Sequence, residues 1–155
     1  EVTDRYPLLV RRIAAADHEI AFHGADHRHL RELQPEAFER TLRTALAKLE
    51  DCSGAQVRGF RAPFFSMEPR TSWCLPMLAA HGFEYDASIY PGPNDRYGWP
   101  GAPSSPVRHA STNLVLFPVP LLHPRLPVAF SGGAYLRILP YRIIEWGFHR
   151  QEERG

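Results

Sequence analysis

Hydrophobic and polar positions along this chain alternate between the spacing of helices and that of strands. An apolar stripe predicts a first helix that begins at Tyr6-Pro7; its members are Leu8, Leu9, Ile13 and Ala16. A clearer helix is predicted from Pro35 to a stop near Gly54, with a stripe of Phe38, Leu42, Ala45, Leu46 and Leu49. Two more helices are expected at 71–80, which Pro76 would kink or shorten, and at 141–149.

Short apolar runs between these helices predict four strands, at residues 19–22, 57–60, 85–89 and 114–117. Strands that alternate with helices favour a parallel sheet. The pattern therefore predicts an α/β fold, with residues 1–155 forming one domain. Residues 91–106 hold five prolines and three glycines, which predicts a long loop.

Composition and charge argue against some classes of function but do not identify one. The chain has 155 residues, of which 44% are hydrophobic and 23% charged, and its net charge of +1 comes from interspersed acids and bases. Nothing in this balance points to nucleic acid or to an anionic membrane. Cys52 and Cys74 form neither a disulfide framework nor a metal motif. No apolar run approaches the roughly 18 residues of a membrane span, and no signal peptide is visible.

The most informative polar feature is the pair His23 and His27, which follows the predicted strand at 19–22. Two imidazoles four residues apart can bind one divalent ion of the zinc type. Gly24 and Asp26 disfavour a helix, so the pair is placed on a loop at a strand end, where sites are commonly built. Taken alone, such a pair is more often solvated surface. Asp26 either orients a ligand histidine or stabilises the turn.

Three further segments follow the histidine pair in order. HGADHR at 23–28 is succeeded by RGFRAPFFS at 58–66, GFEYDASIYP at 82–91 and GGAYLR at 132–137. This series resembles the polysaccharide deacetylases that share the NodB-homology domain. It is most similar to the branch found in exopolysaccharide loci associated with exosortase systems. The resemblance covers nearly the whole chain, and the first two segments are its most specific parts.

The resemblance implies a partial, distorted (β/α) barrel and a metal-dependent hydrolase that removes N-acetyl groups from a polysaccharide. It implies that His23 and His27 are ligands of a divalent metal, expected to be Zn²⁺. Arg61 is expected to line the groove and brace the catalytic carboxylate. Three residues are candidates for contact with the sugar: Asp86, Phe65 and Tyr135. Alternatively, Asp86 caps a local turn, and Phe65 and Tyr135 pack in the core.

The chain also departs from the family pattern. Gly24 stands where many relatives carry Ser or Thr. The family's upstream carboxylate pair has no counterpart before His23, because Glu1 and Asp4 lie beside a helix start. The family's late histidine followed by proline has no expected counterpart either, since His123-Pro124 precedes the Gly132-Gly133 segment. We therefore expect one incomplete deacetylase domain that is inactive alone. The alternatives are a non-catalytic carbohydrate-binding relative and a small metal-binding protein unrelated to sugars.

Overall fold

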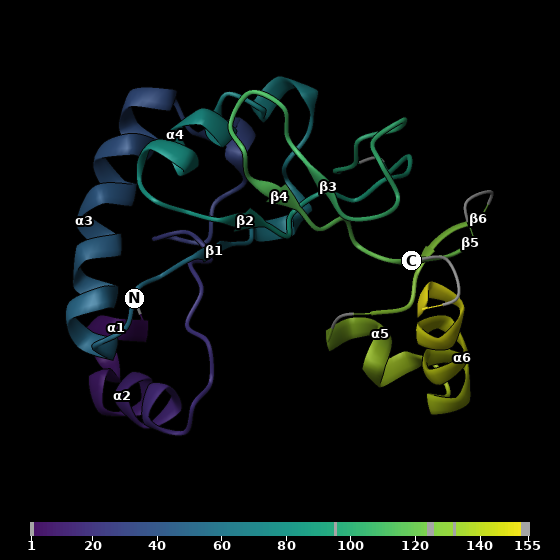
Figure 1. The fold of residues 1–155 in the computed structure, drawn as a ribbon, viewed down its shortest axis with the longest axis horizontal. Coiled ribbons are helices and arrows are strands. Elements are labelled where there is room, and N and C mark those ends of the chain that lie inside the picture. Colours follow the sequence, from purple (N-terminus) through teal and green to yellow (C-terminus); the bar gives the residue numbers. More distant parts are fainter. Residues whose placement is uncertain (1, 95, 124–125, 132, 153–155) are drawn as a thin grey trace.

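The computed structural model describes residues 2–94, 96–123, 126–131 and 133–152 (Figure 1). Pro124 and Gly132, both discussed above, lie outside these residues. Helices and strands alternate along much of the chain, as predicted, and the chain's core lies between a small sheet and the helices that cover it.

Three helices form the N-terminal side: α1 (Val2–Arg5), α2 (Pro7–Ala15) and α3 (Pro35–Ser53). The predictions of α2 and α3 are confirmed. Helix α3 has a proline in its first turn and ends at Gly54, whose φ of 69° is the left-handed conformation that glycine tolerates best. It buries Phe38, Leu42, Leu46 and Cys52.

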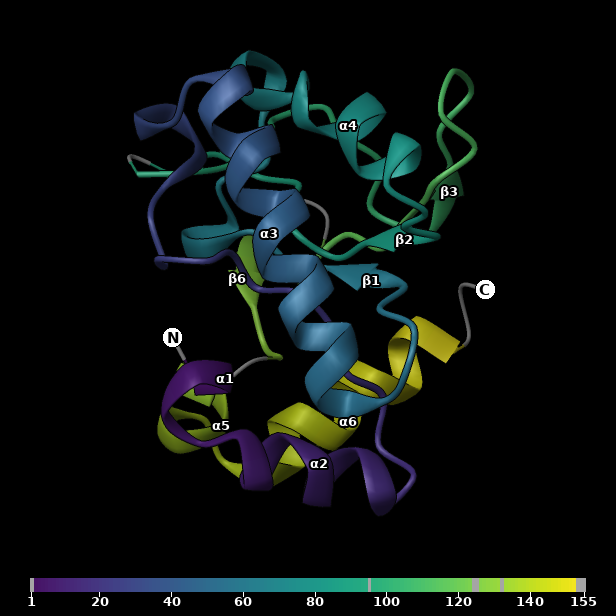
Figure 2. The same cartoon turned by 90° about the vertical axis from the view of Figure 1, so that its left-hand side faces the viewer.

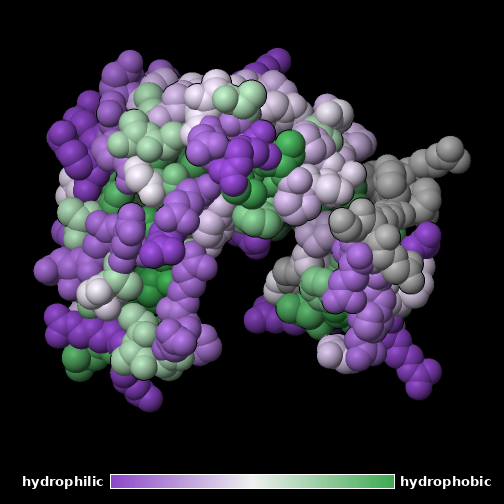
Figure 3. Space-filling model, in the orientation of Figure 1, coloured by the Kyte–Doolittle hydropathy of each residue, from purple (hydrophilic) through white to green (hydrophobic). Residues whose placement is uncertain are grey.

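The spacing of the apolar stripe of α2 suggests a face packed on the core, but most of this stripe is exposed. Val10 is the buried residue of this helix, whereas Leu8 is 69% and Leu9 is 48% exposed. Figure 3 shows this apolar surface at the lower left, over α2. The spacing correctly predicted a helix, but spacing alone does not decide what an apolar face packs against.

A four-stranded sheet has the order β1-β2-β4-β3. Strands β1 (Gly59–Phe60), β2 (Tyr85–Asp86) and β4 (Val115–Leu116) run parallel, as predicted. Strand β3 (Val107–Arg108), which was not predicted, pairs antiparallel with β4 at the edge. The strand expected at 19–22 is reduced to one parallel bridge between Phe22 and Phe60. The strand expected at 85–89 ends at Asp86.

Helix α3 lies across one face of this sheet, with α4 (Cys74–Ala80) beside it (Figure 2). Pro76 lies in the first turn of α4, so the helix is shorter than predicted. The core between these layers joins aromatic residues from the sheet and α3; Phe22 and Phe60 stack at 5.9 Å, and Phe38 meets Phe60 edge-on at 6.2 Å. Short 3₁₀ turns cover Leu30–Glu32, Pro63–Phe65 and Pro69–Thr71.

The C-terminal part consists of the strands β5 (Leu121–His123) and β6 (Leu126–Ala129) and the helices α5 (Gly133–Ile138) and α6 (Tyr141–Glu152). The last helix was predicted; the antiparallel pair β5-β6 and α5 were not. Helix α6 is held by an edge-on contact of Phe148 with buried Phe130 and by a 3.1 Å hydrogen bond from Gln151 Nε2 to the Leu121 carbonyl. In the described residues no helix is long and apolar enough to cross a membrane.

Gly147 of α6 offers a test of this packing. A Cβ atom at this position would lie 2.6 Å from the ring of buried Phe130. We expect Gly147→Ala to lower the free energy of unfolding by about 1–3 kcal/mol, although alanine is the better helix former. Gly133→Ala in α5 is the matched control, because no atom lies within 4 Å of its added Cβ. Equal stability of the two variants in urea unfolding would contradict the close packing of Gly147 against Phe130.

Candidate metal and substrate site

Three chain segments meet where neighbouring strands end. His23 follows the bridge residue Phe22, Arg61 follows β1, and Ser88 lies two residues beyond β2. Backbone bonds hold the segments in register: the Arg61 N–H donates to the Phe22 carbonyl at 2.9 Å, and the Ala87 N–H donates to the Phe60 carbonyl at 2.8 Å. The carboxyl ends of parallel strands are where α/β folds build their sites.

His23 and His27 lie side by side at this edge. Their ring centroids are 5.1 Å apart and both residues are exposed. Nδ1 of His23 lies 2.6 Å from the Arg61 carbonyl oxygen. Because a carbonyl oxygen only accepts, Nδ1 carries the hydrogen. In the neutral ring, Nε2 then keeps its lone pair for a cation.

Gly24 is explained by backbone geometry. Its φ is +80°, a conformation that side chains rarely adopt, and an added Cβ would lie 3.2 Å from Cγ of Pro63. The loop therefore turns between the two histidines in a way that the family's usual Ser or Thr would strain. The departure from the family pattern at Gly24 is thus tied to the shape of this loop.

Five non-glycine residues of the described chain have left-handed backbone, and three of them lie at this site: His27, Phe64 and Phe65, with φ of 52°, 59° and 51°. Such residues each cost about 1–3 kcal/mol and cluster at functional sites. The Phe64 ring is 52% exposed and contacts His27 edge-on at a centroid distance of 5.0 Å. It also stacks on His29 at 6.3 Å. An exposed aromatic face thus adjoins the histidine pair.

Arg61 is exposed beside the same loop. Its guanidinium carbon lies 5.7 Å from the centroid of the Phe65 ring, a cation–π arrangement. No carboxylate of the described residues lies within ion-pair distance of Arg61. Its charge slightly opposes the rise that burial causes in the pKa of Asp86. The guanidinium is therefore available to a carboxylate or substrate, and its expected bracing role stays a prediction.

Asp86 lies beneath the surface. It is fully buried, and its carboxylate accepts hydrogen bonds from the hydroxyl and the backbone N–H of Ser88. Burial raises the pKa of Asp86 to about 6, while the Ser88 bonds and the Arg61 charge act in the opposite direction. This burial leaves no part of Asp86 at the surface of the chain, where a sugar would bind. The alternative of a turn-capping aspartate matches its bond to the Ser88 N–H.

Phe65 and Tyr135 gather in one partly buried aromatic cluster. Both pack against a group that contains Tyr90, and Tyr97 lies 5.9 Å from Phe65 and 5.3 Å from Tyr90. Tyr97 comes from the loop at 91–106, so it was missed by motif reading. Phe65 and Tyr135 are each half-buried, a position compatible with packing in the core and with contact to a sugar.

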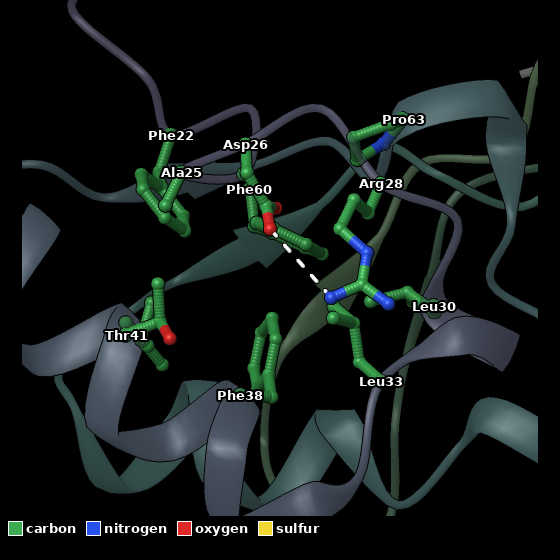
Figure 4. Close-up of a pocket in the computed structure, with 12 residues that line it drawn as sticks. Phe22, Ala25, Asp26, Arg28, Leu30, Leu33, Phe38, Thr41, Phe60 and Pro63 are labelled. Carbon is green, nitrogen blue, oxygen red and sulfur yellow. Dashed lines mark ion pairs between the residues drawn. The ribbon is translucent and has the colours of Figure 1, made fainter. Parts of the chain in front are cut away.

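The space around the histidine loop separates into two parts. Beneath the loop, a pocket of about 20 Å³ is lined by the phenylalanines Phe22, Phe38 and Phe60, and the Arg28–Asp26 ion pair at 3.9 Å lies at its side (Figure 4). It is too small for a sugar ring. A groove of about 630 Å³ runs past Ile20 and Phe22 to His23 and His27 and is bounded on its other side by α1 and α3.

The two histidines fit a divalent ion as part of a ligand set. They are exposed and adjacent, and the hydrogen bond of His23 Nδ1 leaves Nε2 free for a metal. Among the described residues, no three or more His, Cys, Asp or Glu side chains are grouped so as to hold a metal ion. A catalytic zinc takes three protein ligands, so at least one more group is needed.

Comparison with known families places the chain. Residues 1–85 match the polysaccharide deacetylase family, and residues 87–155 match a domain of unknown function, DUF3473. The chain belongs to the polysaccharide deacetylase family. A peptidoglycan deacetylase-like protein of Gibberella zeae is 30% identical over 86 residues, which are 56% of this chain and 25% of that protein. The chain thus spans a quarter of this relative.

Solved structures agree on the fold. A protein of Mycobacterium smegmatis assigned to the polysaccharide deacetylases is 30% identical with a TM-score of 0.60, over 76% of this chain and 37% of its own. A Pseudomonas aeruginosa protein assigned to the same family and the allantoinase PuuE are each 18% identical with TM-scores of 0.60, over 94% of this chain and 48% and 47% of theirs. The fold is a partial (β/α) barrel, as predicted.

Proposed function

We propose that this chain supplies the two-histidine half of the metal site and the groove arginine of a polysaccharide de-N-acetylase. The observation that carries the proposal is the hydrogen bond from His23 Nδ1 to the Arg61 carbonyl. It joins the HGADHR and RGFRAPFFS segments into one site and leaves His23 Nε2 for a cation. Membership of the deacetylase family supports the reaction class.

The residues of this chain then have distinct tasks. His23 and His27 would hold Zn²⁺ or a similar divalent ion through ring nitrogens. Such an ion polarises an amide carbonyl and makes water a better nucleophile. Arg61 would fix the orientation of the carboxylate that acts as general base, because a guanidinium donates several hydrogen bonds in one plane.

The groove along Ile20 and Phe22 is where we place the family's carboxylate pair, which has no counterpart before His23. Phe22 uses its N–H and its carbonyl to bond with Gly59 and Arg61, so the backbone groups of Ala21 and His23 point to the opposite side. A strand laid in the groove would extend the sheet at this edge. Aspartates at its carboxyl end would lie next to both histidines, where the general base and a third ligand are needed.

The substrate class follows from the resemblance and from the exposed aromatic face of Phe64. We propose a polymer of N-acetylated amino sugars, with an exopolysaccharide as the expected context. Neutral sugar rings pack on aromatic faces through their apolar C–H surfaces. The near-zero net charge of the chain gives no attraction to a polyanion.

Acetate release provides the test. We expect the intact protein to release acetate from acetylated glucosamine oligomers, to lose this activity with a chelator and to regain it with Zn²⁺. Residues 1–155 alone should be inactive, because loss of positioned acid and base groups costs about 10²- to 10⁴-fold each.

Two other outcomes favour the alternatives. Oligomer binding without acetate release by the intact protein would favour a non-catalytic carbohydrate-binding relative. Zinc binding with no affinity for the oligomers would favour a metal-binding protein unrelated to sugars. Acetate release by residues 1–155 at the rate of the intact protein would contradict the assignment, and would direct attention to His123.

A further inference from the structure

One peptide group links the exposed site to a buried carboxylate. The Arg61 carbonyl, which accepts from His23 Nδ1 at 2.6 Å, and the Ala62 N–H belong to the same peptide unit. The Ala62 N–H donates to Ser88 Oγ at 2.7 Å. The Ser88 hydroxyl in turn donates to Asp86 Oδ1. The order from surface to interior is therefore His23, the 61–62 peptide, Ser88 and Asp86.

The hydrogen bonds in this series all donate in the same direction, from His23 toward Asp86. The hydroxyl of Ser88 accepts from Ala62 and so directs its own hydrogen to Asp86, while the imidazole donates because a carbonyl oxygen cannot. A chain of aligned hydrogen bonds polarises its members, and a terminal carboxylate strengthens that effect. Polarisation of the 61–62 peptide makes the Arg61 oxygen a stronger acceptor for the imidazole N–H.

The groups at the inner end of this hydrogen-bond series are buried, which protects their bonds from water. Asp86 and Ser88 are both fully buried, as is the Ala62 side chain at 1% exposure. The Asp86 carboxylate also accepts from the Ser88 N–H at 3.2 Å, which fixes its orientation. Burying a carboxylate is costly, and this one has no lysine or arginine in ion-pair contact among the described residues. Such a cost points to a role beyond packing.

We infer that Asp86 and Ser88 are positioning residues that act through the 61–62 peptide to hold His23 in its Nδ1–H tautomer and strengthen Nε2 as a metal ligand. Ligand histidines generally need such a partner on the second ring nitrogen, and its loss costs about 10- to 100-fold in metal affinity. The inference rests on the proposed metal site. It assigns Asp86 and Ser88 a task away from the sugar.

The test uses the intact protein, Zn²⁺ alone and Ser88→Ala. We expect calorimetric titration to show a loss of zinc affinity of about tenfold or more. In the metal-free protein labelled with ¹⁵N-histidine, we expect the fraction of His23 protonated at Nδ1 to fall, because the carbonyl that selects this tautomer is weakened. Asp86→Asn keeps an acceptor oxygen but removes the charge, so it should change both quantities in the same direction by less.

Thr71→Val is the matched control. Thr71 is also a buried hydroxyl that accepts a backbone N–H, from Glu68 at 3.0 Å, but it has no bond to the 61–62 peptide. It should lose comparable stability and keep the zinc affinity and the His23 tautomer of the parent protein. Equal changes in Thr71→Val and Ser88→Ala would overturn the inference, because a merely structural role would then suffice.

Unchanged affinity and tautomer in Ser88→Ala would also overturn it. If Ser88→Ala does not fold, Asp86→Asn decides by the same two measurements. If the parent protein binds no zinc, the proposed function fails. In that case the tautomer measurement still decides whether Asp86 and Ser88 position His23, because it uses the metal-free protein.

Discussion

His23→Ala in the intact protein is expected to lower kcat/KM for acetate release by more than about 100-fold. Loss of an outer partner of a ligand histidine already costs about 10- to 100-fold, and this substitution removes the ligand itself. The fold should tolerate the change, because the His23 side chain is exposed and, within the described residues, its hydrogen bond is to the Arg61 carbonyl. Zinc affinity, measured by calorimetry, should fall together with activity.

His18→Ala is the matched control, since His18 is also exposed and lies five residues earlier, before the bridge at Phe22. It should keep activity and zinc affinity. Nanomolar zinc affinity that survives replacement of both His23 and His27 would contradict the metal site. Full activity of His23→Ala would remove the histidine pair from the mechanism.

Several parts of this structure were predictable from local rules. Helix α3 carries a first-turn proline, a five-residue apolar stripe and a glycine stop, so each local signal agrees with its burial. The strands predicted at 19–22 and 57–60 also end directly before His23 and Arg61. Parallel strands bring their carboxyl ends to one edge, which made their meeting predictable.

Other parts depend on contacts that sequence spacing does not reveal. The stripe of α2 reads as a buried face, yet Leu8 and Leu9 are exposed, because amphipathic spacing does not identify a partner. Strands of two residues, such as β3, are too short for a periodic signal. Asp86 gives the same turn signal whether it faces solvent or the core; its burial comes from the elements packed around β2.

Ser88 was missed for a related reason. The spacing Asp-x-Ser is an ordinary turn pattern, in which an aspartate accepts from the backbone two residues ahead. Its importance comes from the Ala62 N–H, which lies 26 residues away in sequence. Only the pairing of β1 with β2 brings that N–H to the Ser88 hydroxyl.

Arg61 contributes to the site through two separate groups. Its carbonyl orients His23, whereas its guanidinium lies over the Phe65 ring. A side-chain substitution leaves the carbonyl in place, so it changes the guanidinium role alone. Arg61 therefore allows the orientation of the metal ligand and the bracing of the catalytic carboxylate to be measured separately.

Arg61→Lys in the intact protein is expected to lower kcat by about 10- to 100-fold with little change in KM. Lysine keeps the positive charge but loses the planar set of donors that fixes a carboxylate's orientation. Hydrogen bonds to charged groups contribute about 1.5–3 kcal/mol, which corresponds to this loss in rate. Zinc affinity should stay unchanged, because the carbonyl that holds His23 belongs to the main chain.

Steady-state kinetics and melting temperature, measured on the same preparation, decide the role of the guanidinium. A loss confined to the transition state lowers kcat and kcat/KM together. If Arg61 instead holds the loop by its contact with Phe65, the variant should melt at a lower temperature and keep its turnover per folded molecule. Unchanged kcat would remove the Arg61 side chain from the catalytic groups and leave its carbonyl as the part of this residue that serves the site.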